Sequence, residues 1–295
     1  MIDGCHMKNP LRNTLLITVL ISVLSGCVKL VTQLSPSLIP NLTQTFFEEC
    51  DPELARLSFP ADLKLMEGLV RNDPENKQLL TALCMGFTGY SMLFVPEEDS
   101  ERASRLYLRA RHYGFKALGR KGAFLKESDR DGESLQEKLK TLGEREFKAL
   151  FYTTMAWHAW INLNLDKPAA LSQMGIAQAC LRRVLELNPG YLYGTPYVLM
   201  GTLLAAKPEL AGGDAPQAKV FFEKGMEVSK GKFYFVQYYF ARVYAVRIQD
   251  KGLFQRLAQE VVQGHPSDLK DVCLINSIMQ QKAKKLLGMT EDFFL

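Results

Sequence analysis

The segment from Leu181 to Pro189 reads LRRVLELNP. Its apolar residues Leu181, Val184 and Leu185 recur at spacings of three and four residues, which is the period of an amphipathic α-helix. Asn188 and Pro189 interrupt the pattern, because proline disfavours helical geometry at the residue before it and is tolerated in the first turn of a following helix. The segment therefore predicts the end of one helix, a turn and the start of another.

Two other segments look like copies of this unit, namely Leu65–Pro74 (LMEGLVRNDP) and Phe221–Ser229 (FFEKGMEVS). The aromatic run Phe233–Phe240 favours a strand by composition, but its apolar pattern continues to Val246, and this length favours a helix. The sequence thus predicts an all-α fold, a TPR-like helical hairpin array or α-solenoid. The helices are expected over residues 53–71, 75–94, 99–119, 133–141, 144–164, 168–187, 191–206, 214–229, 232–248, 251–263 and 268–287.

The composition excludes several classes of protein. With 47% hydrophobic residues, 21 Gly and 13 Pro among 295 residues, the chain is neither disordered nor fibrous. A net charge of +4 is too small to indicate nucleic-acid binding. The sequence contains no phosphate-binding loop, no nucleophile elbow and no metal-binding histidine pattern. We therefore expect no enzymatic activity, no cofactor and no metal.

The N-terminus carries an export signal. Lys8 and Arg12 precede an apolar run over residues 15–24, which is typical of a signal peptide. As a helix these ten residues span about 15 Å, half the roughly 30 Å hydrocarbon layer. The tetrad Leu24-Ser25-Gly26-Cys27 resembles the bacterial lipobox, which implies cleavage before Cys27 and lipidation of its thiol.

These features divide the chain into three parts. We expect a signal peptide over residues 1–26, a lipidated N-terminus and tether over 27–50, and one helical domain over 51–295. Residues 33–45 are rich in Ser, Pro, Thr and Asn, which is typical of a flexible tether. The mature protein is then periplasmic and held at a bacterial membrane, inner or outer, by its lipid.

The later cysteines, Cys50, Cys84, Cys180 and Cys273, are sparse. Export permits a disulfide, but their spacing forms no dense disulfide framework. We expect buried thiols on helices rather than a disulfide.

Two helices carry polar or aromatic residues suited to a ligand site. Trp157, Trp160 and Asn164 share one face of an otherwise apolar helix, either as core residues or as the lining of a ligand site. Tyr238, Arg242 and Gln249 share a face of another helix. Such an arginine is either in a structural ion pair or in a binding site, because an unpaired buried charge costs several kcal/mol.

We also include Arg111, which lies on an apolar side of its helix, as a possible partner of an anion. If these residues form a ligand-binding site, Trp157, Trp160, Asn164 and Arg242 should converge on the largest cavity. Gly86, Gly89, Gly114 and Gly201 are expected to allow close packing between helices.

Several strings together resemble the T component of tripartite ATP-independent periplasmic (TRAP) transporters. They occur in order from about Asp51 to the C-terminus: Gly86–Tyr90, Leu106–Gly114, Ala156–Asn164, Tyr193–Pro196, Leu210–Asp214 and Gly231–Phe233. The resemblance implies a non-catalytic, all-helical lipoprotein with cryptic TPR-like repeats. Its expected partner is the periplasmic substrate-binding component of a TRAP transporter, and its expected ligand is a small organic acid or an apolar molecule.

A second interpretation is a general TPR scaffold for protein interactions in envelope assembly. In either case we expect self-association, because a solenoid with this hydrophobic content exposes much apolar surface.

Overall fold

A computed structural model describes residues 37–95, 98–125, 132–207 and 212–294. These residues form helices and no strand, so the all-α prediction is confirmed. None of the described helices is long and apolar enough to cross a membrane. The expected signal peptide over 1–26 and the expected lipidation site Cys27 lie outside the described residues.

The helices follow the expected order. Their bounds are α3 (Leu38–Glu48), α4 (Pro52–Asn72), α5 (Lys77–Phe94), α6 (Ser100–Leu118), α7 (Gly132–Lys140), α8 (Phe147–Asn162), α9 (Pro168–Leu171), α10 (Met174–Leu187), α11 (Tyr191–Ala206), α12 (Ala215–Ser229), α13 (Tyr234–Tyr239), α14 (Lys251–Gln263), α15 (Cys273–Gly288) and α16 (Thr290–Phe293). Short 3₁₀ helices cover Gly119–Leu125 and Pro266–Val272, and a π-helix over Phe240–Ala245 continues α13.

Polar side chains begin several of these helices. Asp51, Asn76, Asp99, Asp214 and Asp250 each precede a helix and accept a hydrogen bond from a backbone N–H of its first turn. These contacts satisfy amide groups that have no partner within the helix, and each contributes about 1 kcal/mol.

The tether prediction is wrong for residues 38–45. These residues belong to α3, in which Ile39 is buried and Phe46 packs against Phe59 at 4.7 Å between ring centroids. The polar composition of the segment concealed a few apolar residues at helical spacing, and burying them against the domain stabilises the helix.

The helix expected over 168–187 is divided into α9 and α10. The carbonyl of Ala169 accepts hydrogen bonds from the side chains of Ser172 and Gln173. Such side-chain bonds compete with the backbone ladder of a helix, which explains the break at this point.

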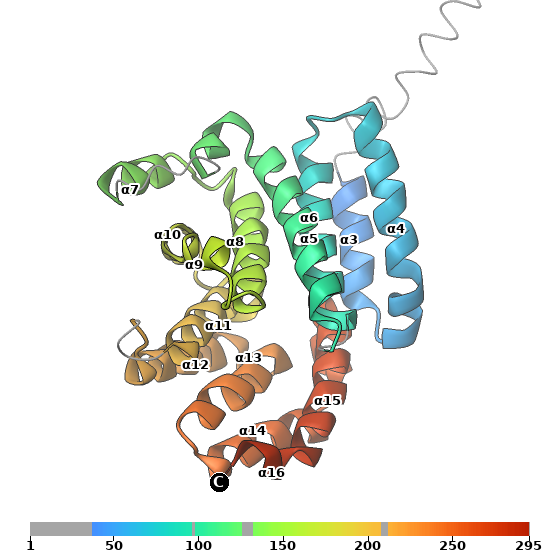
Figure 1. Cartoon of the computed structure of the whole chain (residues 1–295). Helices are drawn as coiled ribbons and strands as arrows, with labels where there is room; N and C mark the ends of the chain where they lie inside the picture. Colours follow the sequence, from blue (N-terminus) through green and yellow to red (C-terminus); the bar gives the residue numbers. More distant parts are fainter. Residues whose placement is uncertain (1–36, 96–97, 126–131, 208–211, 295) are drawn as a thin grey trace, which may run out of the picture.

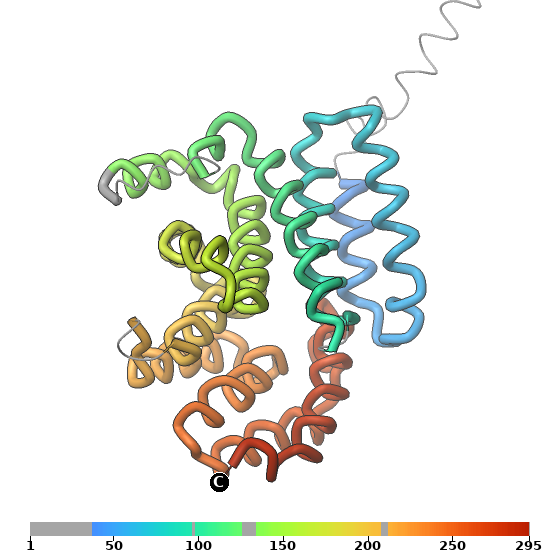
Figure 2. The backbone as a smooth tube through the Cα atoms, viewed as in Figure 1, coloured from blue at the N-terminus to red at the C-terminus, as the bar shows by residue number. Residues whose placement is uncertain are grey.

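Many successive helices contact one another, such as α4 with α5 and α11 with α12, and the two ends of the series also meet. Both α3 and α4 contact α15, and α3 also contacts the 3₁₀ helix Pro266–Val272 (Figures 1 and 2). In Figure 1, α15 lies below α3 and α5, at the end of a circuit that runs through α8, α11 and α13. The TPR-like helical hairpin array expected from the sequence stays a prediction.

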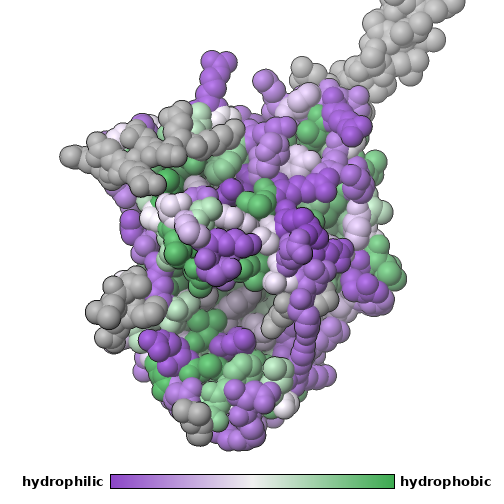
Figure 3. Space-filling model, viewed as in Figure 1, coloured by the Kyte–Doolittle hydropathy of each residue, from purple (hydrophilic) through white to green (hydrophobic). Residues whose placement is uncertain are grey.

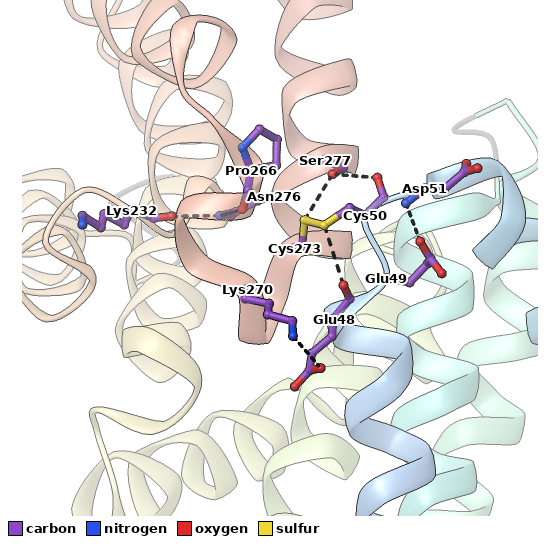
Figure 4. Close-up of a disulfide and its surroundings, with 10 residues drawn as sticks. All are labelled: Glu48, Glu49, Cys50, Asp51, Lys232, Pro266, Lys270, Cys273, Asn276 and Ser277. Carbon is purple, nitrogen blue, oxygen red and sulfur yellow. Dashed lines mark hydrogen bonds and ion pairs between the residues drawn. A yellow bond between two sulfur atoms is a disulfide. The ribbon is translucent and has the colours of Figure 1, made fainter.

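A disulfide joins the two ends. Cys50, two residues after α3, is bonded to Cys273, the first residue of α15 (Figure 4). The expectation of free thiols is therefore wrong for this pair and confirmed for Cys84 and Cys180, which are buried and unpaired. The sequence did not predict this disulfide, because the two cysteines come together only where the two ends of the series of helices meet.

Close packing at glycine is confirmed at three of the four expected positions. A Cβ at Gly114 would lie 1.9 Å from Thr153 Oγ1, and one at Gly86 or Gly201 would lie within 2.9 Å of a neighbouring side chain. At Gly89 a Cβ would meet nothing within 4 Å, so the prediction is wrong there. Gly89 instead faces the cavity described below.

Candidate ligand cavities

An apolar cavity lies inside the circuit of helices, with a volume of about 70 Å³. Its lining comes from elements far apart in the sequence: α3, α4, α5, α8, α11, α13 and α15 all contribute. Phe46 and Phe47 of α3 cover it from the N-terminal side, and Leu274 and Ile275 of α15 from the C-terminal side. The cavity is therefore completed only where the two ends of the chain meet.

Methionine and aromatic side chains are frequent in this lining. The methionines are Met66, Met85, Met92 and Met155. Unbranched thioether side chains adapt to ligands of different shape, so methionine is frequent in binding surfaces of broad specificity. Asp62 is the one charged residue among the described lining, and burial raises the pKa of its carboxyl group.

A second, larger cavity of about 230 Å³ has a more polar lining. It lies between α5, α6, α8, α11 and α13, and includes the side chains of Tyr107, Asn162 and Thr202. Lys282 of α15 is its one charged residue among the described lining, which contains no carboxylate. A lysine in this lining is a candidate partner for an anionic group.

The polar groups of this cavity are mostly neutral at physiological pH. Burial lowers the pKa of His158 to about 4, and its Nε2–H donates to the carbonyl of Ala177 at 3.0 Å, which leaves Nδ1 as an acceptor. Burial also raises the pKa of Tyr107 to about 12. The buried hydroxyl of Thr202 has no hydrogen-bond partner among the described residues. A polar ligand would satisfy this hydroxyl, whose isolation costs about 1–3 kcal/mol.

Three side chains separate the two cavities. Met92, Met155 and Phe235 line both of them. The ammonium group of Lys282 donates to the carbonyl of Met92 at 3.2 Å, so the cation lies beside this wall. Two of the three side chains are methionines, which are unbranched and flexible.

A left-handed turn at the start of α11 shapes the apolar cavity. Leu192, Tyr193 and Gly194 have φ angles of 45°, 53° and 84°, and Leu192 and Thr195 line the cavity. Left-handed geometry costs leucine and tyrosine about 1 kcal/mol or more each, and such strain is found most often at functional sites. A Cβ at Gly194 would also lie 3.2 Å from Gly225 Cα, so this position requires glycine.

The residues predicted from the sequence lie in two groups outside these cavities. In the first, the Arg111 guanidinium lies 5.1 Å from the Trp157 ring and 5.0 Å from the Trp160 ring. Asn164 is buried two residues after the end of α8, where its Nδ2 donates to Ser104 Oγ at 3.0 Å and its Oδ1 accepts from Lys167. Trp157, Trp160 and Arg111 therefore come together, and Asn164 fastens the end of α8 to α6.

The second group holds the C-terminal segment. Arg242 lies 4.7 Å from the ring of Phe293, and Gln249 donates to the carbonyl of the same residue at 3.0 Å. Tyr238 packs edge-on against Tyr239 at 5.3 Å. The expected convergence of Trp157, Trp160, Asn164 and Arg242 on the largest cavity is thus absent, because none of the four lines either cavity and Arg242, on the π-helix, packs against Phe293.

The sequence did contain a signal for the missed lining. On α8, residues Met155, His158, Ala159 and Asn162 recur at spacings of three and four, and all four line the polar cavity. Because α8 is buried on almost every side, its apolar period does not distinguish the cavity face from the core face.

Comparisons with known proteins identify one family that this chain matches. A family model described as TRAP transporter T-component matches residues 48–294. A protein of Treponema pallidum (strain Nichols), described as uncharacterized, is 24% identical over 271 residues, which cover 86% of this chain and 84% of that protein.

Proposed function

Because the chain belongs to the TRAP transporter T-component family, we propose that it docks the periplasmic substrate-binding protein of such a transporter and holds or passes its ligand through the two adjoining cavities. The family supports an accessory role in transport. The cavities support the ligand-holding part of the proposal, and the wall of Met92, Met155 and Phe235 that they share is the observation that carries it.

The linings favour an amphipathic carboxylate. An alkyl chain suits the apolar cavity, where methionine and aromatic side chains replace water around it. A carboxylate suits the polar cavity, where Lys282 is the charged lining residue and Thr202 offers a hydroxyl. Such a ligand would cross the wall with its chain on one side and its charge on the other.

Membrane attachment and self-association complete the proposal. Cys27 would carry the lipid that keeps the protein at the membrane; labelling with palmitate checks this, and Cys27→Ser should abolish it. Leu54, Leu57 and Leu65 of α4 are 54–63% exposed, which favours contact between copies. Sedimentation of the purified protein gives the oligomeric state, and a strictly monomeric protein would contradict the proposed self-association.

The test of the whole proposal is binding to partner and ligand. The purified protein is mixed with the substrate-binding protein of its transporter and, separately, with a panel of alkyl carboxylates. We expect a stable complex and saturable carboxylate binding. Failure of both would overturn the proposal, as would crosslinking in cells that recovers envelope proteins unrelated to a transporter and never the substrate-binding protein. The latter result would indicate a general scaffold.

A further inference from the structure

Arg111 lies in a cluster apart from both cavities. The cluster consists of Arg111 and Phe115 on α6, Trp157 and Trp160 on α8, and Gln173 between α9 and α10. The guanidinium lies 5.0–5.6 Å from the centroids of the three aromatic rings. Its Nη1 donates to Gln173 Oε1 at 2.6 Å, and the same oxygen accepts from Trp157 Nε1 at 2.9 Å. The orientation of the guanidinium is therefore fixed from two sides.

Arg111 differs from five other arginines in its electrostatic surroundings. Arg56, Arg105, Arg109, Arg183 and Arg256 each form an ion pair with a glutamate. Arg111 forms none with any described carboxylate, although burial lowers its pKa to about 10, so that it stays charged at neutral pH. Removing a cation from water without a counter-charge costs several kcal/mol, and cation–π contacts of about 1–2 kcal/mol offset part of this.

The unused donors of Arg111 remain open. A guanidinium has five N–H groups, and among the described residues Gln173 accepts from one of them. The guanidinium nitrogens that have no partner among the described residues are not fully buried. Aromatic rings thus cover the guanidinium while part of its hydrogen-bonding edge reaches the surface, which is an arrangement suited to bidentate binding of an anion.

We propose that Arg111, oriented by Gln173 and stacked on Trp157 and Trp160, binds a carboxylate at the protein surface, as a site separate from the two cavities. A single planar guanidinium matches a monoanionic carboxylate in geometry and in charge. Leu108, one turn earlier on α6, is 36% exposed and suits an apolar group attached to that carboxylate. A phosphate dianion is disfavoured, because the single positive charge of Arg111 would balance only one of its two negative charges.

The carboxylate has two possible sources: a small free acid, or an acidic side chain of a docked protein. Two probes distinguish them. Sodium isobutyrate represents the free acid, and a blocked Leu-Glu-Leu tripeptide amide represents the side chain, with Leu-Gln-Leu as its uncharged match. Stronger binding of the glutamate tripeptide than of isobutyrate indicates a docking contact, and the reverse indicates a small acid.

Tryptophan fluorescence reads this site directly, because Trp157 and Trp160 are the two tryptophans of the whole sequence. The full-length protein is titrated with each probe at constant ionic strength, with sodium chloride and sodium phosphate as references. We expect a saturable change in emission with a carboxylate probe. In Arg111→Gln the affinity should fall about tenfold or more, because a charged hydrogen bond is lost.

Two further variants keep the test informative. Arg111→Lys retains the charge but lacks the planar guanidinium, so it should bind the carboxylate more weakly than wild type. This variant provides the test if Arg111→Gln fails to fold. Arg242→Gln removes an arginine stacked on Phe293 elsewhere and should bind like wild type. The proposal is overturned if no carboxylate changes the emission, if phosphate binds as well as carboxylate, or if Arg111→Lys and wild type bind alike. Because the readout does not involve the cavities, its failure leaves the proposed transport role intact.

Discussion

The disulfide between Cys50 and Cys273 fastens α3 to the start of α15 across 223 residues of sequence. Both connected segments line the apolar cavity, through Phe46 and Phe47 on one side and Leu274 and Ile275 on the other. Figure 4 shows two further contacts beside the disulfide, from Ser277 to the carbonyl of Cys50 and from Lys270 to Glu48. The closure of the helical circuit is thus covalent, and it occurs where the cavity is completed.

We predict that reduction destabilises the protein and loosens α3. In the chain-entropy model a cross-link over a loop of this length contributes up to about 5 kcal/mol to the free energy of unfolding. Urea denaturation with and without a phosphine reductant should show a lower midpoint after reduction. The double variant Cys50→Ser, Cys273→Ser is the control, and its midpoint should not respond to the reductant. An unchanged midpoint in the wild-type protein would contradict the prediction.

We predict opposite effects of alanine at two glycines. In Gly114→Ala the new Cβ would meet Thr153 Oγ1 at 1.9 Å and Cys84 Sγ at 2.9 Å, so the free energy of unfolding should fall by about 1–3 kcal/mol. Gly89→Ala places its Cβ in open space on α5 and should gain up to about 1 kcal/mol from helix propensity. Thermal unfolding of both variants checks this, and equal effects would show that the contact between α6 and α8 is looser than described.

We predict a loss of stability between pH 6.5 and pH 4 that depends on His158. Burial lowers its pKa from 6.5 to about 4, so the unfolded chain binds a proton in this range that the folded protein does not. Stability is therefore complete above pH 6.5 and declines as the pH falls, by about 3 kcal/mol at pH 4. In His158→Gln this part of the pH dependence should disappear. A parallel pH profile in the variant would mean that other groups cause the loss.

The mixed surface in Figure 3 illustrates why the sequence predicted helices better than the site. On this face hydrophobic patches alternate with polar ones, as expected of amphipathic helices. Helix order and most boundaries followed from local signals such as Asp214 and Asn188. The apolar cavity did not follow from them, because its lining is completed by the contact of α3 with α15, which no local pattern records.

The same contrast, between local sequence signals and contacts of segments distant in the sequence, explains the individual errors. Trp157 and Trp160 stood out as large aromatic side chains, and they proved to surround Arg111 rather than a cavity. Met155 lies on the same helix and lines both cavities, but methionine is an ordinary core residue in a sequence. In the sequence Lys282 resembles an ordinary surface residue, and only the position of α15 beside α5 shows that it reaches Met92.

The most direct test of the central claim compares octanoate with octanol, which share a chain and differ in charge. Lys282→Gln keeps a donor for the carbonyl of Met92 but removes the cation, so it should weaken octanoate about tenfold and leave octanol unchanged. Gly89→Leu adds a side chain where the cavity is open and should weaken both ligands. Calorimetric titration of the wild-type protein and the two variants gives these affinities. The account is contradicted if the wild-type protein binds neither ligand, if Lys282→Gln affects both equally, or if Gly89→Leu affects neither.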